Sequence, residues 1–471
     1  MDARELATRI MLNLPYDPND QQVQLIAALA RFCVSSADDN PVFLLNGYAG
    51  TGKTSLTGSL VKTLGEIGVT SVLLAPTGRA AKVFAAFAQH TAYTIHRKIY
   101  KAPDITDTSG IFGGVTENKH KYTVFIVDEA SMIGAASGNE YGGNLLEDLI
   151  HYVYSGHKCR LILLGDTAQL PPVGCDESPA MNVNVLRSYG LRVTRVTLTE
   201  TVRQAADSGI LYNATVLRKA MKIDPLPSPM LFISRFEDVE NISGEFLAES
   251  ISDSYDADGI DATILITRSN KRAVQFNHAI RTNILYKEEE LTRDELLLVA
   301  KNNYHWSADV KGLDFIANGD VATVTRVYGT ERKYGFRFAD VSLLFPDHEI
   351  ELNCKILLDT LTSESPALET QRFKELYHQC ITDPELFPPE ATMSARIRAL
   401  RTNPYFNALQ VKYAYAVTCH KSQGGQWRNV YVDMGYIPPE AQGLDFYRWL
   451  YTATTRATHR LYFVNPAIEI K

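Results

Sequence analysis

Residues 41–54 join an apolar stretch of strand length to a glycine-rich loop that ends in Lys53 and Thr54. The loop, residues 47–54, reads GYAGTGKT and matches every fixed position of a phosphate-binding loop. Glycines at this spacing let backbone N–H groups point at phosphates beside a helix N-terminus. The lysine can reach the β- and γ-phosphates, and the Thr54 hydroxyl can bind Mg²⁺. The sequence therefore predicts a strand, a loop and a helix that hold and hydrolyse a nucleoside triphosphate, whereas the alternative is a chance glycine-rich turn.

The composition is that of a globular protein with more than one domain. The chain has 471 residues, of which 45% are apolar and 21% charged, and this length suggests roughly two to four domains. No apolar run is long enough to cross a bilayer and the N-terminus shows no signal-peptide pattern, so we expect a cytoplasmic protein with no membrane partner. The six cysteines include no CxxC pair, which argues against a zinc site and a disulfide framework. The net charge of −7 still permits a nucleic-acid partner, because binding needs only local positive charge.

Apolar runs of strand length alternate with stretches of helical periodicity. Helical periodicity is clear at 22–32 and 55–67, and strand-like runs lie at 72–75, 122–127 and 160–164. Buried strands that alternate with helices predict a parallel sheet with its ligand at the carboxyl ends of the strands. We expect two α/β domains, the second of them interrupted. Its strand-like runs lie at 262–266, 413–417, 430–432 and 461–464.

Two segments depart from the α/β pattern and are predicted to be insertions. Residues 320–403 begin with short alternating segments and turn residues, which predicts a small antiparallel β module followed by a more helical stretch. Residues 97–121 contain the run SGIFGG at 109–114, which predicts a protruding hairpin or loop.

Two acidic residues follow the strand-like run at 122–127. Asp128 and Glu129 would lie at the sheet edge that carries the phosphate loop. We predict that Asp128 holds Mg²⁺ and that Glu129 orients and deprotonates the attacking water, because phosphoryl transfer depends on positioning and charge neutralisation. Paired acids at a strand end are otherwise solvent-exposed caps, but after a phosphate loop they indicate catalysis.

Three further polar side chains are candidates for contacts with the γ-phosphate. Gln169 lies in the segment GDTAQLPPVG (165–174), and its amide can contact both the γ-phosphate and the water. Arg203 and Arg456 come from outside the first predicted sheet. If the two α/β domains face each other across the nucleotide, these arginines would stabilise the charge of the transition state. The alternative is a proline-stiffened turn and two surface arginines.

Six segments follow one another in a fixed order along the chain. They are 47–54, 75–81 (APTGRAA), 128–131 (DEAS), 165–174, 418–424 (TCHKSQG) and 451–456 (YTATTR). This ordered set resembles the RecD/Dda-type branch of the superfamily-1 helicases, and the likeness spans nearly the whole chain apart from the two insertions. The resemblance implies an α/β fold of two RecA-like P-loop domains, with ATP and Mg²⁺ between them and single-stranded DNA across their top.

The resemblance also implies domain limits. The first RecA-like domain would comprise 1–96 and 122–200, and the second 201–319 and 404–471. Residues 97–121 would form a pin that splits the duplex, and residues 320–403 an SH3-like insertion domain.

Individual residues acquire roles from the same resemblance. Gln22 matches a glutamine that reads adenine, with Gln21 as its neighbouring alternative, and Gln426 falls where relatives hold the ribose. The implied nucleotide contacts are Gln22, Gly47, Gly50, Thr51, Gly52, Lys53, Thr54, Gly424 and Gln426, and the Mg²⁺ ligands are Thr54 and Asp128. The implied catalytic residues are Lys53, Glu129, Gln169, Arg203 and Arg456. The implied DNA contacts are Thr77, Arg79, Thr94, His96, Thr418, His420 and Ser422.

The leading hypothesis is an ATP-dependent DNA helicase that moves 5′→3′ on single strands and unwinds duplex at single-strand/duplex junctions. An RNA-directed helicase is the alternative within this class, because phosphate and stacking contacts need not read the 2′-OH. A regulatory NTPase switch that needs no nucleic acid is the alternative outside it. Residues 418–424 and Arg456 argue against a switch, which requires no second domain. Tyr405, Phe406 and Trp427 are expected in cores.

Overall fold

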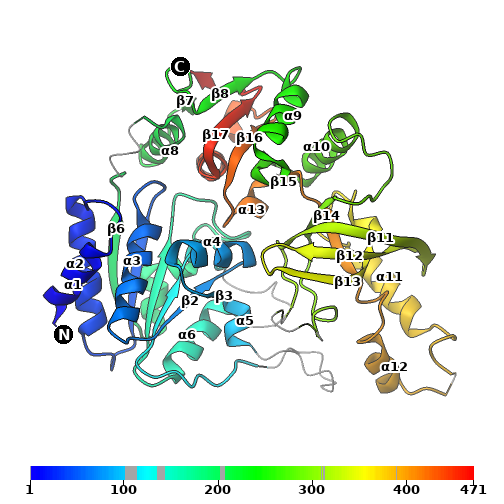
Figure 1. Cartoon of the computed structure of the whole chain (residues 1–471), viewed down its shortest axis with the longest axis horizontal. Coiled ribbons are helices and arrows are strands. Elements are labelled where there is room, and N and C mark those ends of the chain that lie inside the picture. The colour runs from blue at the N-terminus through cyan, green and yellow to red at the C-terminus, as the bar shows by residue number, and fades with distance from the viewer. Residues whose placement is uncertain are drawn as a thin grey trace.

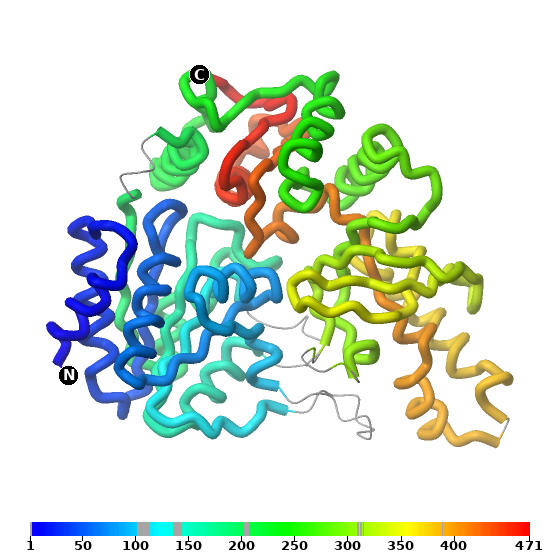
Figure 2. The backbone as a smooth tube through the Cα atoms, viewed as in Figure 1, coloured from blue at the N-terminus to red at the C-terminus, as the bar shows by residue number. Residues whose placement is uncertain are grey.

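The computed structural model describes residues 2–100, 114–134, 144–201, 207–308, 310, 313, 315–388 and 390–471. Within these residues the chain forms two parallel sheets and a closed barrel (Figure 1). Figure 2 shows the course of the backbone: the N-terminal end lies beside the first sheet, and the C-terminal end lies beside the second.

The first sheet contains the predicted phosphate-loop strand at its interior. Its six strands pair in parallel in the order β3-β2-β4-β5-β1-β6. Alternate residues of β1 enter different cores, Val42 and Leu44 on one face and Phe43 and Leu45 on the other. Both faces are therefore covered by helices, as expected of a parallel sheet. The strands are β1 (Pro41–Gly47), β2 (Ser71–Ala75), β3 (Ala92–Thr94), β4 (Val124–Val127), β5 (Arg160–Gly165) and β6 (Arg192–Leu198).

The first sheet and its helices form the first unit. Its helices include both of the helices that the sequence predicts. The periodic stretches at 22–32 and 55–67 form α2 and α3. The unit contains α1 (Ala3–Leu12), α2 (Asp20–Val34), α3 (Lys53–Glu66), α4 (Gly78–Ala88), α5 (Ile95–Ile99), α6 (Leu145–Ser155), α7 (Val183–Ser188) and the 3₁₀ turns η1 (Ala130–Met132) and η2 (Pro179–Met181).

The second sheet, which with its helices forms the second unit, has five strands in the order β15-β9-β16-β17-β8, again all parallel. The strands are β8 (Val239–Ile242), β9 (Thr263–Thr267), β15 (Ala416–Thr418), β16 (Trp427–Asp433) and β17 (Ala457–Val464). A separate pair joins β7 (Met230–Leu231) to β18 (Glu469–Ile470). The helices are α8 (Gly209–Ala220), α9 (Leu247–Asp258), α10 (Asn270–Asn283), α13 (Cys419–Ser422) and α14 (Leu444–Thr454), with η4 (Ile260–Ala262) and η6 (Pro439–Ala441).

A closed five-stranded barrel, β10-β11-β12-β13-β14, lies beside both sheets (Figure 1). Its strands are β10 (Leu296–Val299), β11 (Val321–Lys333), β12 (Phe336–Phe345), β13 (Ile350–Leu357) and β14 (Leu409–Tyr413). β11 to β13 are antiparallel neighbours within the segment predicted as a β module, and η5 (Leu358–Thr360), α11 (Thr370–Ile381) and α12 (Met393–Leu400) follow them. β10 and β14 come from either side of residues 320–403, so the barrel extends beyond that segment.

The prediction of a single strand at 413–417 is wrong. β14 ends at Tyr413 in the barrel and β15 begins at Ala416 in the second sheet, so only two residues connect them. The Asn277 side chain holds the crossing, because it accepts the N–H groups of Tyr415 (3.0 Å) and Ala416 (2.8 Å) and donates to the Ala416 carbonyl (2.8 Å). Both halves of the run are buried in one continuous core. An apolar run cannot reveal that its strand partner changes halfway.

In the described parts of the chain, none of the helices combines the length and apolar character needed to cross a bilayer.

Candidate active site

The phosphate loop has the backbone geometry that its glycines predict. Gly50 (φ 73°) and Gly52 (φ 78°) lie in the left-handed region, which favours glycine. A Cβ on Gly50 would also lie 2.9 Å from a methyl carbon of Leu211 in α8. Thr51 closes the turn, with its N–H (3.2 Å) and hydroxyl (2.7 Å) both donating to the Tyr48 carbonyl. α3 then begins at Lys53, so the N-terminus of this helix faces the loop.

Lys53 and Asp128 form an ion pair, with 3.8 Å between Nζ and Oδ1. Burial alone would lower the pKa of Lys53, but the charges of Asp128, Glu129 and Asp166 outweigh it and raise that pKa. Lys53 is therefore a cation near pH 7. Burial raises the pKa of Asp128, and Lys53 opposes this effect.

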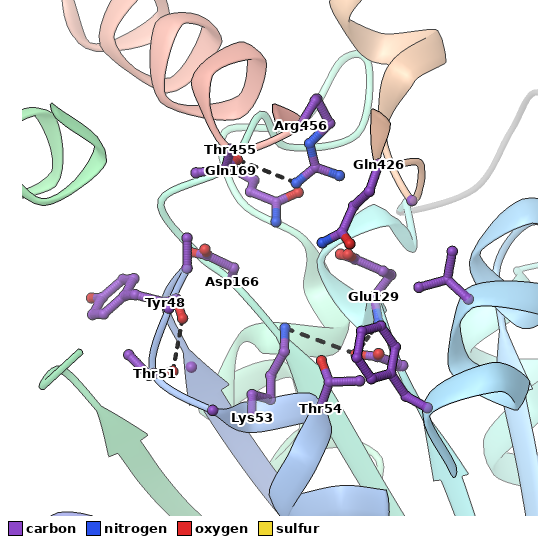
Figure 3. A pocket seen from close by; sticks show the side chains of 18 of the residues that line it. Tyr48, Thr51, Lys53, Thr54, Glu129, Asp166, Gln169, Gln426, Thr455 and Arg456 are labelled. Carbon is purple, nitrogen blue, oxygen red and sulfur yellow. Dashed lines mark hydrogen bonds and ion pairs between the residues drawn. The ribbon is translucent and has the colours of Figure 1, made fainter. Parts of the chain in front are cut away.

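Glu129 adopts a left-handed backbone (φ 52°), which is uncommon for a residue with a side chain. Its N–H donates to Asp128 Oδ1 at 2.9 Å, and its Oε2 atom is buried with no hydrogen-bond partner. Figure 3 shows the side chain pointing into the space above Lys53 and Thr54. A strained backbone that presents an unsatisfied carboxylate oxygen to a cavity is consistent with a general base.

The turn after β5 places Gln169 on the opposite side of this space. Asp166 organises the turn: one of its carboxylate oxygens accepts the Ala168 N–H at 2.9 Å, and its carbonyl accepts the Gln169 N–H at 3.2 Å. Gln169 Oε1 is buried and has no hydrogen-bond partner. Buried polar atoms normally have partners, so the unsatisfied oxygens of Glu129 and Gln169 indicate a polar ligand.

These groups line a cavity of about 290 Å³ between the two sheets. Arg456 reaches it from the second unit, and donates to the carbonyls of Thr452 (3.1 Å) and Gly425 (3.2 Å) and to the Thr455 hydroxyl (3.3 Å). Of the predicted nucleotide and catalytic residues, the cavity is lined by Gly47, Gly50, Thr51, Gly52, Lys53, Thr54, Asp128, Glu129, Gln169, Gly424, Gln426 and Arg456.

The donor set suits Mg²⁺ and a triphosphate. The Thr54 hydroxyl and the Asp128 carboxylate, both in the lining, are the hard oxygen ligands that Mg²⁺ prefers. Lys53, Arg456 and the loop N–H groups supply positive charge and donors for phosphate oxygens. When bound, Mg²⁺ would neutralise charge on those oxygens.

Gln22 is placed beside the phosphate loop but is not among the residues that line the cavity. Its side chain forms a capping box with Asn19 at the start of α2 and donates to the Thr51 carbonyl at 3.0 Å. Gln21 instead binds Thr199 and the N–H of Glu200. Adenine reading by Gln22 therefore stays a prediction.

Arg203 belongs to residues 202–206, outside the described residues. Its predicted role also stays a prediction.

The predicted DNA contacts of the first unit lie at two helix starts. Thr77 and Thr94 are the N-cap residues of α4 and α5. Arg79, in α4, stacks on Trp427 of the second unit. Burial lowers the pKa of His96 to about 4, so this side chain is neutral near pH 7 and offers a ring rather than a charge.

The predicted DNA contacts of the second unit surround α13. Thr418 is its N-cap residue and His420 is exposed. Ser422 is fully buried, and its hydroxyl donates to the Cys419 carbonyl at 2.8 Å. The structure thus directs Ser422 inward, away from any strand on the surface.

Sequence reasoning assigned no role to Tyr451 or Asp166, although both lie within motif segments. Tyr451 lies in α14 and Asp166 directly follows β5, and a 2.6 Å hydrogen bond joins them. The only sequence signal is their presence in the ordered motifs, because the partner of each is set by the docking of the two units.

Two family models match the chain. An AAA domain matches residues 18–222, and a UvrD-like helicase C-terminal domain matches residues 413–464. The first match contains the phosphate loop, Glu129 and Gln169, and the second contains α13 and Arg456.

Several proteins are similar over part or most of the chain. The uncharacterized protein R530 of Acanthamoeba polyphaga mimivirus is 22% identical over 90% of this chain and 95% of its own length. The ATP-dependent RecD2 DNA helicase of Deinococcus radiodurans is 32% identical over 36% of this chain and 21% of its own length. The ATP-dependent DNA helicase dda of Enterobacteria phage T4 is 33% identical over 29% of each. The alignments with these two named helicases thus span less than a third of either one.

Among solved structures, a Pif1 helicase from Bacteroides in complex with ADP-AlF3 and ssDNA has a TM-score of 0.49 and 16% identity, and the match covers 96% of this chain and 93% of that chain. The two family matches and the two helicase relatives support the resemblance of the six ordered motifs to the RecD/Dda branch of the superfamily-1 helicases, a family of ATP-hydrolysing enzymes.

Proposed function

We propose that the chain uses ATP hydrolysis to move 5′→3′ along single-stranded DNA and to unwind duplex at single-strand/duplex junctions. The observation that carries this proposal is one cavity lined by both units, with Lys53 and Glu129 from the first and Arg456 from the second. Because both units would contact the same phosphates, hydrolysis would change how firmly the two units are held together. Such opening and closing can shift two strand-binding surfaces relative to each other.

Each cavity residue has a part in the proposed reaction. Lys53 neutralises phosphate charge, and Gln169 positions the attacking water whose proton passes to Glu129 Oε2. Arg456 stabilises the charge that develops during transfer. Arg203 is proposed for the same task on its sequence position alone.

DNA is the proposed polymer because both named helicase relatives are DNA helicases. The strand would pass over Thr77 and Thr94 of the first unit and Thr418 and His420 of the second, with Arg79 and His96 beside it. Hydroxyl and backbone contacts of this kind bind phosphates without reading sequence.

We propose the same domain limits that the resemblance implies. The first RecA-like domain is 1–96 with 122–200, the second is 201–319 with 404–471, and 320–403 is an SH3-like insertion domain. Residues 97–121, most of which lie outside the described residues, are proposed to form the pin. The six cysteines are free thiols, which suits a reducing compartment, so we propose the cytoplasm.

A strand-polarity assay tests the proposal. A labelled strand is displaced from duplexes that carry either a 5′ or a 3′ single-stranded tail, with Lys53→Ala as the inactive control. We expect ATP-dependent displacement from the 5′-tailed substrate and ATPase stimulation by single-stranded DNA. Stimulation of ATP hydrolysis by RNA but not by DNA would favour an RNA-directed helicase. ATP hydrolysis that neither polymer stimulates would favour a regulatory switch.

A further inference from the structure

Tyr451 connects the second unit to two separate parts of the nucleotide cavity. Its hydroxyl donates to Asp166 Oδ2 at 2.6 Å and accepts the N–H of Ala49 at 2.9 Å. Ala49 belongs to the phosphate loop and Asp166 to the turn that carries Gln169, and both line the cavity. Tyr451 is 1% exposed and is not itself part of the lining. It therefore contacts the cavity wall from behind.

The surrounding contacts fix the same turn to the second unit. The Leu170 N–H donates to the Thr452 hydroxyl at 2.8 Å, and Gln423 donates to the Leu170 carbonyl at 2.8 Å. Gln169, between Asp166 and Leu170, is thus held on both sides by contacts with the second unit. Its amide oxygen has no hydrogen-bond partner, and Gln169 lines the cavity.

The Tyr451 hydroxyl can make its two bonds only when the units are docked. If α14 withdrew, Asp166 and the Ala49 N–H would both lose the hydroxyl that now joins them. Burial and the charge of Asp166 both raise the pKa of Tyr451 well above its ordinary value, so the hydroxyl keeps the proton that it donates.

We propose that Tyr451 is a positioning residue that holds the phosphate loop and the Gln169 turn in their hydrolytic arrangement only while the two units are closed. It acts through Ala49 and Asp166 rather than on the nucleotide. This inference rests on the proposed ATPase function and adds a means by which hydrolysis depends on closure.

The test compares two tyrosines of the same helix. Tyr451→Phe removes the hydroxyl and leaves the ring. Tyr447→Phe is the matched control, since Tyr447 lies one turn earlier, is also 1% exposed, and donates one 2.7 Å hydrogen bond to the Pro227 carbonyl, away from the cavity. ATP hydrolysis is measured with and without oligo-dT, the affinity for a fluorescent ADP analogue by titration, and thermal stability by the unfolding midpoint.

For Tyr451→Phe we expect kcat to fall about tenfold or more, because a hydrogen bond to a charged group is lost, while ADP affinity changes much less. Tyr447→Phe should lower the unfolding midpoint to a similar extent and keep kcat close to the wild type. Asp166→Asn combined with Tyr451→Phe should be no slower than the slower single variant, because both disrupt one link. Fully additive losses, an unchanged kcat in Tyr451→Phe, or equal losses of kcat in both tyrosine variants would overturn the proposal.

Failure of the motor proposal would look different. A wild type that hydrolyses ATP without displacing any strand would contradict the helicase function, and the comparison of the two tyrosine variants could still be made on that hydrolysis.

Discussion

The guanidinium carbon of Arg79 lies 3.9 Å from the centroid of the Trp427 ring. Arg79 belongs to α4 of the first unit and Trp427 begins β16 of the second, so this stack crosses the boundary between them. A Cβ on Gly425 would lie 2.6 Å from the indole ring and 2.8 Å from Arg79 Nε. The glycine therefore leaves the room that the stack needs.

This stack should contribute to holding the units together. A desolvated cation–π contact is worth about 2 kcal/mol, so Arg79→Met and Trp427→Leu should show a coupling of roughly 1–2 kcal/mol in a double-mutant cycle of the free energy of unfolding. Arg79→Lys should retain part of that coupling. Simple additivity of the two substitutions would show that the contact is energetically neutral.

Lys53 and Glu129 should fail at different steps. Lys53→Ala should abolish ATPase and unwinding while single-stranded DNA binding persists, because its ammonium faces Asp128 and the phosphate loop rather than the predicted strand path. Glu129→Gln should still bind ATP but hydrolyse it roughly 10²- to 10⁴-fold more slowly, as expected when a general base is lost. Filter binding of labelled ATP and of oligo-dT, together with a phosphate-release assay, separates the two. Normal turnover in Lys53→Ala would refute the assignment of this site.

Arg456 should be needed for hydrolysis more than for nucleotide affinity. Arg456→Ala should lower kcat by about 10³-fold or more, the range for an arginine that stabilises phosphoryl transfer. Arg460→Ala is the control, because Arg460 lies four residues later on the same segment in an exposed ion pair with Glu240. Steady-state kinetics of both variants give kcat and KM. A change in KM alone would assign Arg456 to ground-state binding.

Gly78 and Gly65 should respond in opposite ways to alanine. Gly78 is the first residue of α4, and a Cβ there would lie 2.5 Å from Oδ1 of Asp320, which directly precedes β11 of the barrel. A Cβ on Gly65 in α3 would meet nothing within 4 Å. Gly65→Ala should raise the free energy of unfolding by about 0.5–1 kcal/mol through helix propensity. Gly78→Ala should lower it.

Denaturant titrations measure both glycine variants. Asp320→Ala added to Gly78→Ala should cost less than the sum of the single changes, because it removes the clash. A higher free energy of unfolding for Gly78→Ala would mean that Asp320 can move away from the added methyl group at little cost.

His96 should make stability depend on pH below neutrality. The unfolded chain binds a proton at His96 near its ordinary pKa of 6.5, whereas the folded chain does so only near 4. The unfolded state therefore holds more protons in this window, and stability falls as the pH falls from about 6.5 to about 4. His96→Gln should reduce that loss in urea titrations at pH 7.5, 6 and 5. If the free energy of unfolding changed with pH equally in the variant and the wild type, His96 would be solvated in the folded protein.

Local patterns predicted the parts of the site that local sequence builds. The strand, loop and helix around Lys53 follow from contiguous residues, and Asp128 and Glu129 follow from the end of one buried strand. The left-handed backbone of Glu129 could not be predicted, because residues other than glycine rarely adopt it and nothing in the local sequence specifies it.

Features that depend on a partner distant in sequence were missed. The Tyr451 hydroxyl meets Asp166 across 285 positions of the chain, and nothing in either motif names that partner. The division of 413–417 between the barrel and the second sheet is of the same kind.

Because of that division, the connection between the barrel and β15, the strand before α13, is very short. Ala414 and Tyr415 alone span it, and the Tyr415 hydroxyl is itself fixed to Glu295, just before β10, by a 2.9 Å hydrogen bond. Two extended residues reach about 7 Å at most. If the barrel moved the end of β14 farther than this reach, β15 would have to move with it. The positions of Thr418 and His420, which follow β15, would therefore depend on the orientation of the barrel as well as on a bound strand.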